Sequence, residues 1–170
     1  MIDNDCDGLI DCNDPDCPPC PPAKKDPTII RFGRAGLDLL RGHAVLQMTP
    51  VDVASKQIGL LLSNASDVIY RGVVPAGSLT ASGTTFRYSN PDARSAGGIY
   101  SLKIAQYHDG SAYRVNFAAY GDLSAATDPA MRLQVYIGVA PENAPDSLPF
   151  ITTAIPWTRI PTGWRAPRDH

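Results

Sequence analysis

The stretch that decides the fold is Ile99–Tyr107, Ile-Tyr-Ser-Leu-Lys-Ile-Ala-Gln-Tyr, together with Ala112–Tyr120, Ala-Tyr-Arg-Val-Asn-Phe-Ala-Ala-Tyr. In both runs apolar and polar residues alternate, which is the period of an antiparallel strand with one buried face. Between the runs lies His108-Asp109-Gly110, a sequence typical of a tight turn. Two alternating runs joined by such a turn predict a β-hairpin.

Other segments carry the same strand pattern, separated by turn-forming residues: Thr28–Phe32, Gln57–Ser63, Asp67–Val74, Thr84–Tyr88 and Met131–Ile137. Gly36–Leu40 is expected to form a helical turn or an irregular strand, and Leu123–Ala130 a short helix capped by Asp122 or Ser124. We predict an all-β protein, an antiparallel, jelly-roll-like β-sandwich over residues 28–170. Its expected core includes Leu60, Leu62, Leu102, Ile104, Val115, Phe117, Leu133, Val135 and Ile137.

Composition excludes several classes of protein. The chain has 170 residues with a net charge of −2, and its only Glu is Glu142, which disfavours a helical bundle. No run approaches the roughly 18 apolar residues of a membrane helix, so the chain is not expected to span a membrane. The charge balance is not that of a nucleic-acid-binding protein.

The N-terminal segment 1–27 differs from the rest of the chain. It holds all four cysteines, and residues 1–22 carry six Asp with no Lys or Arg. Its prolines exclude a helix, and it has too few apolar residues for a core. We expect an irregular arm that ends in a stiff linker of polyproline type over Cys20–Pro27.

The arm contains a calcium-loop pattern, Asp3-Asn4-Asp5-Cys6-Asp7-Gly8-Leu9-Ile10-Asp11-Cys12-Asn13-Asp14. Asp on alternate residues directs carboxylates at one centre, and Gly8 permits the sharp turn that follows them. Ca²⁺ binds six to eight hard oxygen ligands, and six carboxylates without a cation would repel one another. The predicted Ca²⁺ ligands are Asp3, Asp5, Asp7, the carbonyl of Leu9, Asp11 and Asp14.

Residues 2–17 resemble the short metal-binding motif of MopE-type bacterial surface proteins and are similar to thrombospondin type-3 calcium repeats. The resemblance implies Ca²⁺ bound in disulfide-stapled loops. Unlike the thrombospondin repeats, this sequence has one complete loop, because a second one beginning at Asp11 lacks its Gly. The segments 69–79, 96–99, 119–127 and 163–165 are similar to uncharacterised β-domains of secreted bacterial proteins, which implies an extracellular setting and no activity.

The four cysteines, Cys6, Cys12, Cys17 and Cys20, favour disulfides and an oxidising, extracellular compartment. Three pairings are open, and Cys6–Cys12 with Cys17–Cys20 is preferred because each closes a short local loop. Zinc on four thiols is a rival interpretation, although a Cys₄ site usually pairs two CxxC knuckles. The other rival interpretation is that this segment is an acidic tail without fixed structure.

The sequence does not indicate an enzyme. Nucleotide-binding, zinc-protease and serine-hydrolase motifs are not found. His43, His108 and His170 are interpreted as structural or terminal residues. The carboxylates available for glycoside hydrolysis mostly fall at predicted turns, where Asp is expected anyway: Asp38, Asp52, Asp67, Asp109, Asp122, Asp128 and Glu142.

Two non-enzymatic hypotheses follow. The first is a secreted structural or adhesive module that associates with itself or with another surface protein, as a head-to-tail assembly or fibre. In this hypothesis the arm connects one molecule to the next, and Thr28–Phe32 pairs with its own sheet or with the sheet edge of a neighbouring molecule. The alternative is a carbohydrate-binding sandwich that uses outward side chains: Tyr120, Tyr136, Trp157, Trp164, Arg87, Arg114, Arg132 and Gln134.

Overall fold

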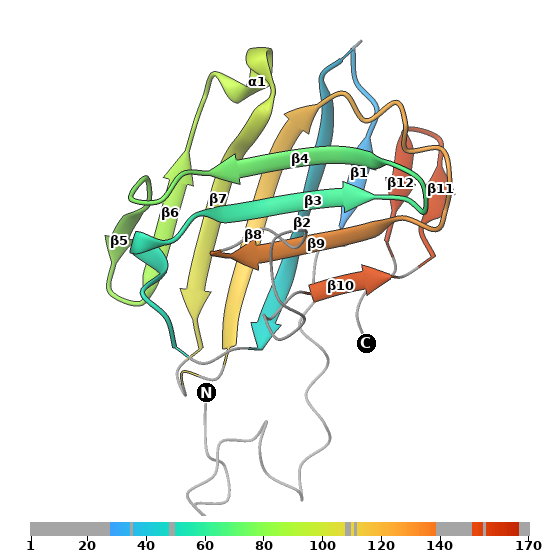
Figure 1. Ribbon diagram of the computed structural model, residues 1–170. Coiled ribbons are helices and arrows are strands. Elements are labelled where there is room, and N and C mark those ends of the chain that lie inside the picture. Colours follow the sequence, from blue (N-terminus) through green and yellow to red (C-terminus); the bar gives the residue numbers. More distant parts are fainter. Residues whose placement is uncertain are drawn as a thin grey trace, which may run out of the picture.

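The computed structural model describes residues 28–34, 36–47, 50–107, 110, 112–138, 151–154 and 156–166. They form two antiparallel sheets packed face to face, so the predicted all-β sandwich is confirmed. In Figure 1 the smaller sheet lies in front, and its strands run across those of the larger sheet. The predicted calcium ligands and all four cysteines lie outside the described residues.

The larger sheet has eight strands in the order β11-β12-β1-β2-β8-β7-β6-β5, and the smaller sheet has four in the order β10-β9-β3-β4. The strands of the larger sheet are β1 (Ile29–Arg31), β2 (Asp38–Gln47), β5 (Thr80–Ser82), β6 (Thr85–Ser89), β7 (Gly98–Gln106), β8 (Ala112–Gly121), β11 (Thr158–Ile160) and β12 (Gly163–Arg165). The strands of the smaller sheet are β3 (Ile58–Ser63), β4 (Val68–Val74), β9 (Arg132–Ile137) and β10 (Ile151–Ala154).

Helical structure in the described residues is limited to the 3-10 turn η1 (Val53–Ser55) and the short helix α1 (Ala93–Ala96). No helix among them is long and apolar enough to cross a membrane. The chain passes between the two sheets after β2, β4, β8 and β10, so each sheet is built from segments that are far apart in sequence. The strand order of each sheet therefore depends on long-range contacts, although the hairpins β3–β4, β5–β6, β7–β8 and β11–β12 pair strands that are neighbours in the sequence.

The core lies between the sheets and is filled by the predicted strand residues. Eight of the nine expected members are at most 3 % exposed, and Ile137 is half-buried at its margin. The hairpin of β7 and β8 forms as predicted, with Leu102 opposite Phe117 and Ile104 opposite Val115. Alternation along these strands therefore identified the buried face correctly.

Two strand irregularities shift the faces that simple alternation predicts. The register of β3 against β4 changes between Leu62 and Ser63, which leaves Val68 54 % exposed while the adjacent Ile69 and Tyr70 are both buried. The register of β7 against β8 changes after Ile99, so Tyr100 is not a core residue. One extra residue in a strand reverses the faces beyond it.

Of the two expectations for Gly36–Leu40, the strand holds from Asp38 onward, whereas the short helix expected over Leu123–Ala130 is wrong. The first segment leads into β2, a ten-residue strand, whose middle residue Gly42 is needed because a side chain there would collide with that of Thr28. The second is a turn without helix, held by the carboxylates of Asp122 and Asp128, which accept hydrogen bonds from nearby backbone N–H groups. Asp122 therefore caps a turn and not a helix.

Residues Thr28–Phe32 contribute β1, which lies between β12 and β2. Ile30 pairs with Trp164 on one side and with Leu40 on the other, so both edges of the strand are occupied within this chain. Of the two expectations for this segment, completion of its own sheet holds. The idea that it adds to a neighbour's edge is wrong.

Tyr70 gives a test of the packing between the sheets. Its ring lies against Gly121 and its hydroxyl oxygen is enclosed without a hydrogen-bond partner. Burial raises the pKa of Tyr70 from 10.0 to about 12. The folded pKa exceeds the unfolded one, so stability is retained below about pH 10 and lost as the pH rises toward 12.

We expect one of the seven tyrosines to ionise later than the others when tyrosinate absorbance is followed in the folded protein. The variant Tyr70→Phe should remove this late step and should be at least as stable as the parent at neutral pH, because it deletes a buried hydroxyl without a partner. A variant that keeps the late step would show that another tyrosine is responsible.

Candidate functional site

Basic side chains gather on the outer face of the larger sheet, which points away from the core. Successive residues of a strand point to opposite faces of the sheet, so in β1, β2, β6, β7, β8 and β12 every second residue points outward. Six of these outward residues are Lys or Arg, and all six are exposed: Arg31, Arg41, Arg87, Lys103, Arg114 and Arg165. We call this set the basic face.

The centre of the basic face is a row of residues that lie side by side on four strands. Arg87 is directly opposite Lys103, Lys103 is opposite Asn116, and Asn116 is opposite His43. Directly opposite side chains are about 5 Å apart at Cβ, and like charges in such pairs are destabilising. The Arg87–Lys103 pair therefore favours an anion bound over it.

The described carboxylates do not neutralise this face. Asp38 is buried, and the other five described Asp residues are exposed in loops: Asp52, Asp67, Asp92, Asp122 and Asp128. The described residues hold twelve Lys or Arg and six Asp, a net +6, while the rest of the chain holds three and eleven, a net −8. Charge is thus strongly segregated along the chain.

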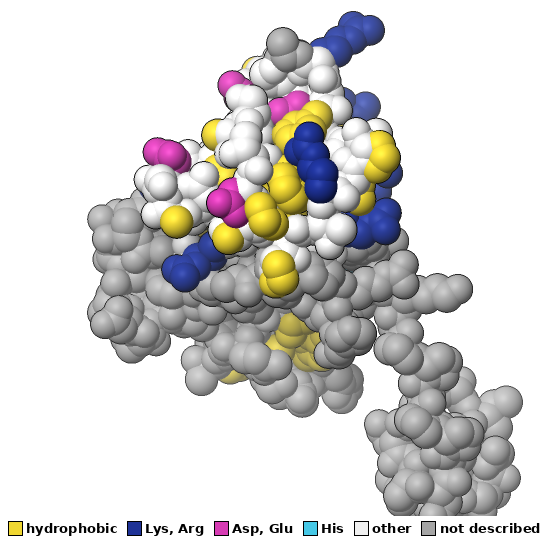
Figure 2. All heavy atoms as spheres, turned by 90° about the vertical axis from the view of Figure 1, so that its right-hand side faces the viewer, with side chains coloured by type: hydrophobic (Ala, Val, Ile, Leu, Met, Phe, Trp, Pro, Cys, Tyr) yellow, Lys and Arg dark blue, Asp and Glu magenta, His cyan; other side chains and the backbone are white. Residues whose placement is uncertain are grey.

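Figure 2 views the molecule from the side of β11 and β12. Lys and Arg side chains gather along its right-hand edge, where the outer face of the larger sheet lies, and Asp side chains lie to the left. Some basic groups rest on aromatic rings. Arg114 lies 5.7 Å from the ring centroid of Tyr107, and Arg94 lies 4.4 Å from that of Tyr100.

His43, predicted to be structural, lies in the central row of the basic face and is half-buried. Its Nε2 atom is enclosed and has no hydrogen-bond partner. Directly opposite His43 on β8 lies Asn116, and the strand partners of His43 include none of the described carboxylates. It does not form an acid–base site with them.

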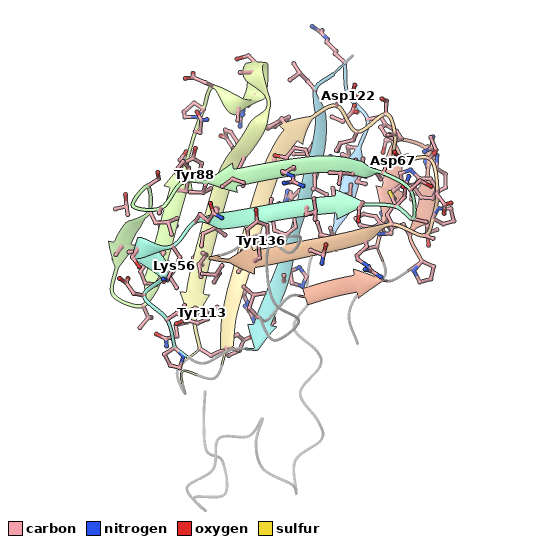
Figure 3. The ribbon with its side chains drawn as sticks, viewed as in Figure 1. Lys56, Asp67, Tyr88, Tyr113, Asp122 and Tyr136 are labelled. Atoms are coloured by element: carbon pink, nitrogen blue, oxygen red, sulfur yellow. The ribbon has the colours of Figure 1, made fainter. Side chains whose placement is uncertain are left out.

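The aromatic residues proposed for sugar stacking are mostly buried. Trp157, Trp164 and Tyr136 are 3 %, 5 % and 2 % exposed, and only Tyr120 is half-buried. The indole N–H groups of both Trp donate to backbone carbonyls, and the ring of Tyr136 covers Gly59 on the smaller sheet (Figure 3). These side chains do not present an aromatic surface to a ligand.

The four polar candidates point outward, as predicted, but they belong to different sheets. Arg87 and Arg114 are on the larger sheet, whereas Arg132 and Gln134 are on β9 of the smaller one. They are therefore not one binding site. The sequence also missed Arg41 and Arg165, because the strands β2 and β12 that carry them were not recognised.

A hollow of about 570 Å³ lies at the end of the smaller sheet. Most of its lining is apolar or backbone, with Arg132 as its charged residue: Ser63, Asn64, Ala65, Pro129, Ala130, Met131, Arg132 and Pro156. The side-chain oxygen of Asn64 already accepts hydrogen bonds from the N–H groups of Ser66 and Asp67. The hollow lacks the convergent polar groups of a specific ligand site.

The carboxylates considered for catalysis are dispersed. Figure 3 shows Asp67 and Asp122 on separate loops, and Asp109 and Glu142 lie outside the described residues. A hydrogen bond to Ser124 lowers the pKa of Asp122, as expected of an exposed turn carboxylate. Within the described part of the chain, no group of three or more His, Cys, Asp or Glu could hold a metal ion.

Asp38 is the exception, because it is buried and its role is structural. One carboxylate oxygen accepts a hydrogen bond from the N–H of Gly33 at 2.8 Å, and the other accepts one from the N–H of Leu123 at 2.9 Å. The side chain thereby joins the turn before β2 to the loop after β8. Both oxygens of Asp38 therefore already have partners. Among the described residues, the exposed pair Arg87–Lys103 at the centre of the basic face is the charged feature best placed to bind a partner.

Comparisons of the chain with protein-family models, curated proteins and solved structures found no match.

Proposed function

We propose that this chain is an extracellular structural or adhesive module, in which a Ca²⁺-stabilised, disulfide-linked arm precedes a β-sandwich that binds its partner through the basic face. The observation that carries the proposal is the set of six exposed Lys and Arg residues on one sheet face, with no described carboxylate among them. A broad, flat, charged surface suits a macromolecular partner, since it has no enclosure for a small molecule.

The calcium part of the proposal rests on the donor set in the sequence. Asp3, Asp5, Asp7, the Leu9 carbonyl, Asp11 and Asp14 supply only hard oxygens, the ligands that Ca²⁺ prefers over softer metals. Bound Ca²⁺ would offset the repulsion among the six Asp and limit the freedom of the arm. Disulfides among the nearby cysteines would also limit the conformational freedom of the arm, because each one links two parts of the chain covalently.

The carbohydrate-binding alternative has less support. Stacking on sugars requires exposed rings, and three of the four candidate aromatic side chains are buried and bonded or packed within the domain. The structural or adhesive hypothesis needs no such platform. Its predicted site is the charged sheet face, which is exposed.

The calcium site is tested by calorimetry on the intact, oxidised protein. We expect Ca²⁺ to bind with a dissociation constant of about 10⁻³ M or tighter, the range of extracellular modules. The variant Asp5→Asn/Asp7→Asn should lose this binding because each change removes a charged ligand. Asp52→Asn/Asp67→Asn is the matched control, since both residues are exposed in loops of the sandwich and should leave binding unchanged.

The assembly part is tested by mass photometry in calcium, repeated after chelation and after reduction. We expect particles larger than one chain in calcium and smaller ones after both treatments. A chain that binds no Ca²⁺ and stays monomeric at high concentration would contradict the proposed function.

A further inference from the structure

We propose that the basic face binds the acidic arm, residues 1–22, of a second copy of this chain, so that the molecules associate head to tail. This inference rests on the proposed function and names its partner. The contact would pair one surface of the sandwich with a segment at the other end of the next molecule.

Charge complementarity identifies the occupant. The basic face carries six positive charges, and residues 1–22 carry six Asp and no Lys or Arg. With one Ca²⁺ bound the segment still carries a net −4, so the calcium-loaded arm remains attracted to the basic face. No other run of the sequence has this density of acid, since the remaining 148 residues have a net charge of +4.

A bound anion would lower the electrostatic energy of the basic face. Arg87 and Lys103 are directly opposite each other on β6 and β7, and their charges repel. Asn116 lies beside Lys103 on β8 and is exposed, which adds a donor to the same row. Carboxylates laid across this row would replace a repulsion with two charge-assisted contacts.

The linker favours the arm of another copy over the arm of the same copy. It is predicted over Cys20–Pro27, and a polyproline helix of eight residues spans about 25 Å. The chain enters β1 at Thr28 in line with the strand, between the neighbours β2 and β12. A stiff linker would make the return of the acidic segment onto its own sheet less favourable than contact with another copy.

Face and arm are different surfaces, so their contact is heterologous. After the first contact, the resulting dimer still has one free arm and one free face. Such contacts close into rings or extend into filaments, depending on the rotation between copies. The association should also depend on salt, because exposed charges are screened over about 10 Å at 0.1 M and about 3 Å at 1 M.

The test uses two complementary variants of the full chain. The face variant, Arg87→Glu/Lys103→Glu, reverses the central pair. The arm variant replaces each Asp of residues 1–22 by Asn. Lys56→Glu/Arg132→Glu is the control for the face, because it makes the same change of charge at exposed positions off the basic face. Sedimentation velocity is measured at about 0.1 M and about 1 M salt, in calcium and in chelator.

We expect the parent and the control to assemble at low salt and to dissociate at high salt. Each variant alone should be monomeric, with self-association weakened by about tenfold or more. An equimolar mixture of the two should form a dimer and nothing larger, because it contains one functional arm and one functional face per pair. Such a limited dimer distinguishes arm-to-face contact from symmetric association.

Other outcomes overturn the inference. If the parent assembles and the face variant assembles equally well, the contact lies elsewhere, although the proposed function stands. If the parent is monomeric but binds dextran sulfate and the face variant does not, the face serves an external polyanion. If the parent is monomeric and the arm variant alone changes its salt-dependent sedimentation, the arm binds its own face.

Discussion

Replacing Asp38 by Ala should destabilise the protein by about 2–4 kcal/mol, because one partly buried and one buried N–H group would lose their acceptor. Those groups belong to Gly33 and Leu123, and the carboxylate is 6 % exposed. Urea unfolding followed by far-UV circular dichroism measures the effect.

Two further variants serve as controls for Asp38→Ala. Asp38→Asn should cost less, since its amide oxygen still satisfies one N–H, although its NH₂ group faces the other donor. Asp52→Ala should change stability by no more than about 0.5 kcal/mol, because Asp52 is exposed and caps η1 with no side-chain hydrogen bond. If Asp38→Ala cost as little as Asp52→Ala, the role of Asp38 in joining the turn before β2 to the loop after β8 would be contradicted.

Trp164→Ala should be the most damaging single change, with a loss of about 4–5 kcal/mol. The indole is 5 % exposed, and its N–H donates to the carbonyl of Ala126 at 2.6 Å. Arg159 lies 5.0 Å from the ring centroid and also covers Phe32. Truncation would therefore leave a cavity, a buried carbonyl without a partner and a guanidinium without its platform.

Trp164→Phe separates these contributions. It keeps a six-membered ring in the core but removes the N–H and part of the indole, so we expect a smaller loss of about 2–3 kcal/mol. Circular dichroism is the appropriate measurement, because each variant removes one of the two Trp that dominate fluorescence. If Trp164→Ala and Trp164→Phe lowered the free energy of unfolding equally, the packing of a ring at position 164 would contribute little, and this explanation of its role would be wrong.

The strands that the sequence predicts well are those with a full alternating pattern. Val115 and Phe117 on β8 alternate with polar residues and proved to be buried. The ten-residue β2 escaped prediction because Gly42 interrupts the pattern, and the glycine is explained only by Thr28, which packs on it in the folded sheet. Strands of three residues such as β11 and β12 are too short to show a period.

Much of the basic face could not be predicted for a related reason. Arg87 and Arg114 were correctly expected to point outward, but nothing in the sequence shows that β6 and β8 flank β7 in one sheet with β2 and β12. The register that sets Arg87 opposite Lys103 is a tertiary property. The charge of the arm, in contrast, is local and is visible directly in residues 1–22.

The position of β1 has a consequence for how the molecule is made. β1 pairs with β12, so the first strand of the sheet has one of its two partners about 130 residues later in the chain, at Gly163–Arg165. During synthesis, the pairing of β1 with β12 can form only after Gly163–Arg165 has left the ribosome. Until then one edge of β1 has no strand beside it, so this edge of the forming sheet stays open to pairing with another chain.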